Sequence, residues 1–292
     1  MKKLESFVDV LVTHPTWQRT SEKDDHIGWV FRDPHDPPVT PLCGHGSIDC
    51  DGCVPPPKGH VLSDCKTVRD IYDISAKSLN MSTEKTIFSV PVLFDSKTKT
   101  IVNNESSEIL RMFNDSFASL EKEKTIDLYP SSLRQEIDDV NEWVYHNINN
   151  GVYKAGFAKS QDAYNTASAA LNKHLLKVET ILSKQRYICN SSTITEADVR
   201  LFMTLVRFDE VYVVYFKCNT TPISTLPNTL NYCRELYQIP EIQKSIHMDH
   251  IKNHYFTSHA PLNTYAIVPV GPDVIKDLSK PHDRAKRFPV SK

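Results

Sequence analysis

The stretch Ser89–Asn114, SVPVLFDSKTKTIVNNESSEILRMFN, decides the fold of this 292-residue chain. Its pattern predicts a strand over Ser89–Phe94, a polar turn over Asp95–Lys99 and a second strand over Thr100–Asn103. The apolar residues that follow recur at helical spacing. The stretch therefore predicts a β-hairpin that leads directly into a helix.

Pro91 lies inside the first predicted strand. Proline has no N–H to give to a sheet, so Pro91 must lie at an edge or where another group uses the neighbouring backbone. A cis Val90–Pro91 bond would leave the backbone of Val90 free to pair with an extended peptide. At the start of the helix, the N–H groups and the Ser106 hydroxyl favour a carboxylate, whereas Glu105 favours an ammonium. These residues predict a binding site for a peptide with charged ends.

The composition excludes several classes of protein. Basic and acidic residues nearly balance, at 34 and 36, so no basic surface is predicted for nucleic acid or an anionic membrane. No apolar segment approaches the length that crosses a bilayer. The seven cysteines are odd in number and unevenly spaced, which favours a reducing compartment over a disulfide framework. We therefore expect a cytoplasmic protein without nucleic-acid or membrane partners.

The N-terminal part of the chain predicts little regular structure before the hairpin. Phe7–Val12 is interpreted as a strand, and the tract from His14 to about Thr67 contains too many prolines for helix or central strand. A helix is predicted over Val68–Leu79. The charged, proline-ended segment Glu121–Pro130 is typical of a linker.

From Ser131 onward the pattern becomes helical. Apolar residues between Leu133 and Ile148, and again between Ala163 and Leu182, recur every three or four positions and predict two long neighbouring helices. Thr195 and Asp198 form the pattern of a capping box, with Asp in place of the usual Glu. We therefore assign Asp198 to folding rather than to catalysis.

The hairpin segment, with its VPVL and NNESSE motifs, resembles the glutathionyl-hydroquinone reductases, an Xi-class branch of the glutathione transferases related to the omega class. Further stretches resemble the same family, so that the resemblance extends from about Glu5 to Phe288. These stretches are THPTWQRT with IGWVF, NNGVYKAGFAKSQDAY, TEADVRLFMTLVRFDEVYVVYFKCN, HIKNHYFTSH, and VPVGPD with PHDRAKRF.

The resemblance implies an α+β fold of two domains. Residues 1–120 would form a thioredoxin-like, glutathione-binding domain, residues 121–130 a linker, and residues 131–292 an all-helical domain with an extended tail. It also implies a homodimer. Glutathione would be held by the backbone of Val90 beside Pro91 and by Glu105 and Ser106, with the indole of Trp29 closing over it.

The resemblance further implies that Tyr153 and Tyr255 are the active-site tyrosines. A phenol is a proton donor near neutral pH, so it can hold a quinol oxygen and protonate the ring. The implied reaction is the glutathione-dependent reduction of glutathionyl-hydroquinones by thiol transfer, with glutathione and quinone-type small molecules as ligands and no metal.

The family's catalytic motif is missing. Family members carry Cys-Pro-x-Ala-His-Arg at the end of the first strand, where a helix N-terminus lowers the thiol pKa. This chain begins with MKKLESFVDVLV, which matches the end of that helix and the second strand. We therefore expect the nucleophilic cysteine to be absent from this chain, foremost because of truncation in an isoform or a gene prediction. Without the first strand, Phe7–Val12 would have no neighbour in the sheet.

Three functions stay open at this point. The first is the reductase itself. The second is a non-catalytic protein of the same fold that binds glutathione or acts as a scaffold. The third is a transferase in which Tyr153 or Tyr255 orients the thiolate of glutathione.

The remaining cysteines do not suggest a metal centre. Cys50 and Cys53 have the spacing of zinc or redox motifs, with Cys43 nearby, but no second pair completes a tetrahedral site. We interpret these three as free loop thiols. The histidines of the HIKNHYFTSH segment have no acidic partners in sequence and are interpreted as structural.

Overall fold

The computed structural model describes residues 7–84, 86–117 and 126–289. The chain divides into two compact units. The hairpin unit comprises Lys2–Lys122 and Asp249–Val268, and the helical unit comprises Glu123–Met248 and Pro269–Lys292. Part of the predicted linker over residues 121–130 lies outside the described residues.

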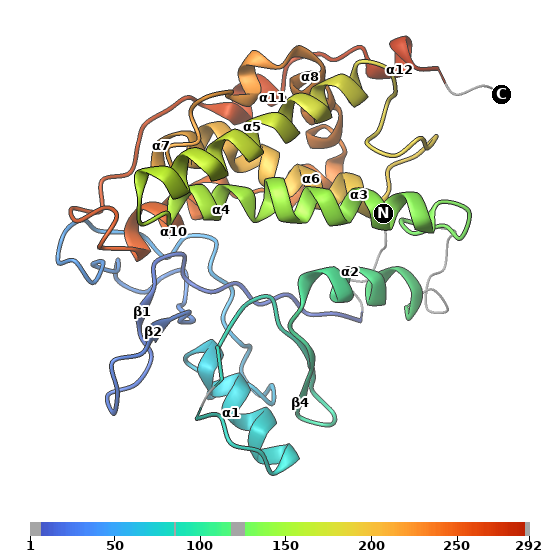
Figure 1. The fold of residues 1–292 in the computed structure, drawn as a ribbon. Coiled ribbons are helices and arrows are strands. Elements are labelled where there is room, and N and C mark those ends of the chain that lie inside the picture. The colour runs from blue at the N-terminus through green and yellow to red at the C-terminus, as the bar shows by residue number, and fades with distance from the viewer. Residues whose placement is uncertain (1–6, 85, 118–125, 290–292) are drawn as a thin grey trace. The chain divides into compact units, whose positions relative to one another are not determined.

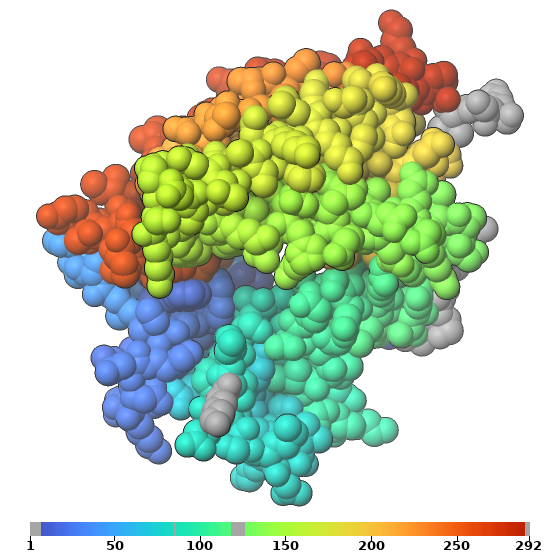
Figure 2. All heavy atoms as spheres, viewed as in Figure 1, coloured from blue at the N-terminus to red at the C-terminus, as the bar shows by residue number. Residues whose placement is uncertain are grey.

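The hairpin unit contains the predicted helix, hairpin and second helix, but the first strand begins at Leu93 and not at Ser89 as predicted. Helix α1 spans Val68–Leu79, strands β3 and β4 span Leu93–Asp95 and Thr100–Asn103, and helix α2 spans Ser106–Asp115. The two strands pair antiparallel, and a bulge lies between Leu93 and Phe94. Figure 1 shows α1 beside β4, and in Figure 2 the atoms from α1 to α2, cyan to green, form a continuous surface.

Local side-chain bonds explain why these elements begin and turn where they do. The Asp95 carboxylate accepts the backbone N–H groups of Lys97 at 2.8 Å and Thr98 at 3.3 Å, which closes the turn of the hairpin. At the start of α1, Thr67 and Asp70 form a reciprocal capping box. Both signals lie within a few residues of the elements that they define.

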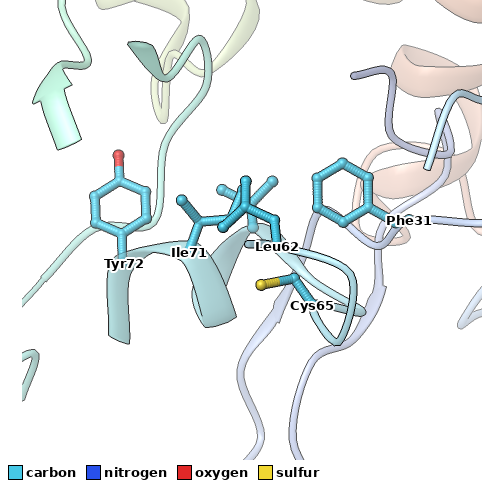
Figure 3. Close-up of a cluster of buried hydrophobic side chains, with 6 residues drawn as sticks. Phe31, Leu62, Cys65, Ile71 and Tyr72 are labelled. Carbon is cyan, nitrogen blue, oxygen red and sulfur yellow. The ribbon is translucent and has the colours of Figure 1, made fainter. Parts of the chain in front are cut away.

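The core of the hairpin unit lies between α1 and the tract before it. Figure 3 shows Leu62 and Ile71 between the rings of Tyr72 and Phe31. Partly buried side chains from the hairpin and from the irregular tract pack against this cluster, among them Trp29, Phe88, Val92, Phe94 and Ile101. The cluster therefore joins the two chain segments that carry the predicted binding residues.

The prediction of a strand over Phe7–Val12 is wrong. Only Val12 makes a β-bridge, with Val54, through N–O distances of 2.9 and 2.8 Å, and Val10 is 71% exposed. In the described residues, the sheet of the hairpin consists of β3 and β4 alone, and this segment pairs with neither strand. The tract from His14 to Thr67 is irregular as predicted, apart from the two-residue strands β1 (Gln18–Arg19) and β2 (Ile27–Gly28).

The helical unit consists of short and long helices around an apolar core. Its helical segments are α3 (Arg134–Val144), η2 (Tyr145–Asn149), α4 (Gly151–Gly156), α5 (Gln161–Leu182), α6 (Glu196–Arg207), η3 (Phe208–Tyr212), α7 (Val213–Tyr215), η4 (Ile223–Thr225), α8 (Pro227–Tyr237), α9 (Pro240–Lys244), α11 (Val274–Leu278) and α12 (Arg284–Arg287). Helix α10 (Met248–Ser258) lies almost entirely in the hairpin unit.

The two long neighbouring helices are present in a modified form. The first is continuous from α3 through the π-helical turn η2 to α4, and its predicted stripe is buried, including Ile137, Val144 and Ile148. Figure 1 shows the second, α5, running alongside α4. No helix in the described ranges has the combination of length and hydrophobicity that spanning a membrane requires.

The capping box at the start of α6 is confirmed. The Asp198 carboxylate accepts the N–H of Thr195 at 2.8 Å and the N–H of Ile188 at 2.8 Å, and the Tyr232 hydroxyl donates to it at 2.9 Å. Complete burial raises the pKa of Asp198, and these donors oppose that rise. Asp198 thus serves folding, because one of these bonds caps α6 and the other two hold it to Ile188 and Tyr232.

Candidate functional site

Val90, three residues before β3, offers unused backbone groups. The Val90–Pro91 bond is cis, and Val90 is 40% exposed. Among the described residues, no group forms a hydrogen bond with the backbone N–H or carbonyl of Val90. An extended chain lying against Val90 can therefore both donate to its backbone and accept from it.

The start of α2 provides the second part of the candidate site. Glu105 is the N-cap residue, and its Oε1 accepts the backbone N–H of Ser107 at 3.1 Å and the Ser107 hydroxyl at 3.0 Å. Ser106 is exposed at the first turn. The structure thus adds a role for Glu105 that the sequence analysis did not include, because its carboxylate caps its own helix.

The sequence analysis missed two residues that connect the hairpin to α1, Asn104 and Tyr72. The amide Nδ2 of Asn104 donates to the Tyr72 hydroxyl at 3.0 Å and to Ser89 Oγ at 3.1 Å. Asn104 lies next to Glu105, and Ser89 lies next to Val90. These bonds therefore bring the two halves of the candidate site onto one support. The NNESS motif that contains Asn104 was the available signal.

Trp29 lies in the same unit, partly buried against the hairpin core. Its ring stacks on the imidazole of His254 with centroids 4.6 Å apart and planes 28° apart. The edge of a second indole, Trp17, meets it at 5.8 Å and 90°. The sequence analysis did not predict this cluster, although THPTWQRT and HIKNHYFTSH contain its members.

The two predicted tyrosines lie in different units. Tyr255 is on α10 in the hairpin unit, 7% exposed, next to the histidine that stacks on Trp29. Tyr153 is on α4 in the helical unit and 36% exposed, and its ring packs with Phe157 at 6.4 Å and Phe216 at 5.3 Å. Within one unit, the structure therefore brings Tyr255 into the neighbourhood of Trp29.

Most of the cysteines are buried. Cys50 and Cys53 are free and lie in a loop, as interpreted, and the structure adds that they are 1% and 2% exposed and pack with Val39. Burial raises the thiol pKa of six of the seven cysteines, to about 11 for Cys53. The six are Cys50, Cys53, Cys65, Cys189, Cys218 and Cys233.

Cys43 is the remaining, partly exposed thiol, and it lies in a loop rather than at the start of a helix. None of the seven cysteines therefore has the surroundings of a thiolate nucleophile. In the described ranges, no three His, Cys, Asp or Glu side chains are gathered to hold a metal ion.

Comparison with known proteins assigns the family. Residues 161–235 match the family described as "Glutathione S-transferase, C-terminal domain". Glutathione S-transferase omega-like 2 of Schizosaccharomyces pombe is 42% identical over 221 residues, which cover 73% of this chain and 69% of that protein. Glutathione transferase Xi 1 from Trametes versicolor has a similar structure, with a TM-score of 0.78, 39% identity and coverage of 92% of this chain and 84% of that chain. This chain belongs to the Xi-class glutathione transferases.

A third similar protein is the glutathionyl-hydroquinone reductase YqjG of Escherichia coli, 49% identical over 199 residues. This chain spans 60% of the length of that reductase. The structure of YqjG with glutathione bound has a TM-score of 0.83 and covers 98% of this chain and 82% of that chain. The predicted α+β class is therefore confirmed: β3, β4, α1 and α2 belong to a thioredoxin-like part, and the helical unit belongs to the all-α part of a Xi-class transferase.

Proposed function

We propose that this chain binds glutathione beside the Val90–Pro91 bond and acts in the glutathione-dependent reduction of glutathionyl-hydroquinones. The observation that supports the proposal most is the unused backbone of Val90 next to the exposed start of α2. The similar reductase of Escherichia coli, whose structure contains glutathione, supports the choice of ligand.

In the proposed site, each part of the tripeptide has a partner. The cysteinyl N–H and carbonyl of glutathione pair with the backbone of Val90, as a strand added to a sheet edge. The γ-glutamyl carboxylate lies at the first turn of α2, where the N–H groups and the Ser106 hydroxyl favour negative charge. Its ammonium lies near Glu105, and the indole of Trp29 covers the peptide.

The proposed reaction breaks one bond and forms another. The C–S bond between glutathione and the hydroquinone ring breaks, the ring carbon keeps the electron pair and takes a proton, and the freed sulfur joins the sulfur of a second glutathione. The products are free hydroquinone and glutathione disulfide. We propose that Tyr153 and Tyr255 hold the ring oxygens and supply the proton. No step through an enzyme thiolate is assigned to a cysteine of this sequence.

A second function is supported by the cysteines. Because burial raises the pKa of six thiols, a protein with only these cysteines is expected to bind glutathione without turnover. We propose this binding or scaffold role as the alternative. A homodimer and a cytoplasmic location remain part of both proposals, and the free state of the seven cysteines supports the reducing compartment.

Isothermal titration with glutathione tests the binding site. Ser106→Ala removes one hydrogen bond to a charged group, so we expect the Kd to rise about tenfold. Ser78→Ala on the exposed side of α1 is the matched control and should leave the Kd unchanged. Equal affinity of Ser106→Ala and the unaltered protein would contradict the proposed tripeptide site.

Chromatography of a reaction with glutathione and a glutathionyl-hydroquinone separates the two functions. The reductase releases hydroquinone and glutathione disulfide in equal amounts, and Tyr255→Phe slows this release by about a hundredfold. Binding of glutathione without any release would select the non-catalytic alternative.

A further inference from the structure

Helix α10 contacts the Trp29 ring through His254. The two rings are close to parallel, with centroids 4.6 Å apart and planes at 28°. Stacked aromatic pairs at this separation attract each other beyond the area that they bury. One face of the indole is therefore covered by a side chain that is distant in sequence.

The orientation of the His254 ring is itself fixed by hydrogen bonds. Its Nδ1 lies 3.0 Å from the carbonyl of Pro15, from which it is 239 residues distant in sequence. A carbonyl can only accept, so Nδ1 carries the hydrogen. The Ser258 hydroxyl, one turn further along α10, donates to the same carbonyl at 3.3 Å. Two side chains of α10 thus hold one backbone group.

The same helix also holds the residues after Pro15. The backbone N–H of Trp17 donates to Ser258 Oγ at 3.0 Å, and the hydroxyls of Thr16 and Thr257 are 2.7 Å apart. The Trp17 ring in turn meets the Trp29 ring edge-on. The rings of His254 and Trp17 are therefore both placed by α10, the first directly and the second through its backbone.

The backbone of Trp29 is held from a different side. Its carbonyl accepts the N–H of Val68 at 3.0 Å, and Val30 forms a β-bridge with Thr67. These bonds fix the main chain at the start of α1. They do not fix the side-chain torsions of Trp29, so the rings that pack against the indole set its angle.

We infer that His254 is a positioning residue for Trp29, which holds the indole at the angle at which it covers the tripeptide. This inference rests on the proposed function, because it assigns the origin of the Trp29 orientation at the proposed glutathione site. Tyr255, the next residue on α10, is then held relative to Trp29 by the same helix. His254 acts through Trp29 and not on the ligand itself.

The test compares two substitutions at one position. His254→Ala removes both the stack and the Nδ1 hydrogen bond, whereas His254→Phe keeps a stacking ring and removes only the hydrogen bond. His247→Ala, an exposed histidine just before α10, is the control. The readouts are the Kd for glutathione and the ¹⁹F resonance of Trp29 in protein labelled with 5-fluorotryptophan. The protein has three tryptophans, so three resonances must be assigned.

We expect His254→Ala to shift the Trp29 resonance and to raise the Kd about 3- to 10-fold. This change in affinity corresponds to the energy of one aromatic pair. His254→Phe should restore the Kd to within about twofold, because the stack remains. The inference is overturned if His254→Ala moves the resonance without changing the Kd, if it moves neither, or if His254→Phe binds as weakly as His254→Ala.

The proposed function can fail separately. If the unaltered protein does not bind glutathione, that function is lost, while the ¹⁹F spectra of the two variants still decide whether His254 orients Trp29. Should His254→Ala not fold, His254→Leu, which keeps a side chain of similar size without a ring, takes its place. A shifted Trp29 resonance with a raised Kd in His254→Leu supports the inference, and values near those of the unaltered protein overturn it.

Discussion

The hydroxyl of Tyr72 donates a hydrogen bond to the carbonyl of Ser89 at 3.0 Å. Helix α1 thereby holds the residue that comes directly before Val90. The same hydroxyl accepts the amide of Asn104, which lies directly before Glu105. One buried phenol thus supports both parts of the candidate site.

Tyr72→Phe should destabilise the hairpin unit and weaken glutathione binding. The substitution leaves the Asn104 amide and the Ser89 carbonyl without their shared partner, at a cost of about 1–3 kcal/mol. Urea unfolding measures the stability and titration with glutathione measures the affinity. Tyr265→Phe, at a tyrosine that is 63% exposed in the same unit, should change neither.

Asp198→Asn should destabilise the helical unit by about 2–4 kcal/mol. An amide cannot accept from all four donors of the carboxylate, so at least one buried N–H or O–H group loses its partner. Asp162→Asn, in the exposed first turn of α5, is the control and should cost less than about 1 kcal/mol. Equal urea midpoints for the two variants would exclude the role assigned to Asp198.

Gly156→Ala should destabilise the protein, whereas Gly151→Ala should not. A Cβ on Gly156 would overlap the fully buried ring of Phe216, so packing must shift at a cost of about 1–3 kcal/mol. A Cβ on Gly151 would lie 3.6 Å from Leu171 Cδ1, an ordinary contact, and alanine is the better helix former. Thermal unfolding of both variants tests whether Gly156 on α4 packs this closely against Phe216, the residue after α7.

Native thiol reactivity should be confined to Cys43. The other six thiols are buried, and their raised pKa values keep them protonated at neutral pH. A protonated thiol reacts slowly with disulfide reagents. We expect one fast-reacting thiol in the native protein and seven in denaturant, with the fast phase absent in Cys43→Ser. A second fast thiol at Cys50 or Cys53 would contradict the burial of that pair.

Stability should fall as the pH drops below about 6.5. Burial lowers the pKa of His14 from its ordinary value of 6.5. Above that value His14 is neutral in both states and has no effect. Below it the unfolded chain takes up a proton that the folded chain does not, so folding weakens with falling pH. His14→Gln cannot titrate, and its melting temperature should fall less between about pH 7.5 and pH 5.5 than that of the unaltered protein.

The sequence by itself determined the elements whose signals are local. The hairpin, helix α1 over Val68–Leu79 and the Thr195–Asp198 capping box were all predicted, because their turn and cap residues lie a few positions from the groups that they bond. The family resemblance indicated the residues of the candidate site, and their roles stay predictions.

Only the tertiary structure decided the contacts between distant segments. No local pattern contains the stack of His254 on Trp29, the burial of Cys50 and Cys53, or the phenol that supports Ser89 and Asn104. The predicted strand over Phe7–Val12 was wrong for the same reason, since a strand exists only where another strand edge accepts its backbone. Periodicity describes which residues share a face, but the partner of that face is chosen by packing of the whole chain.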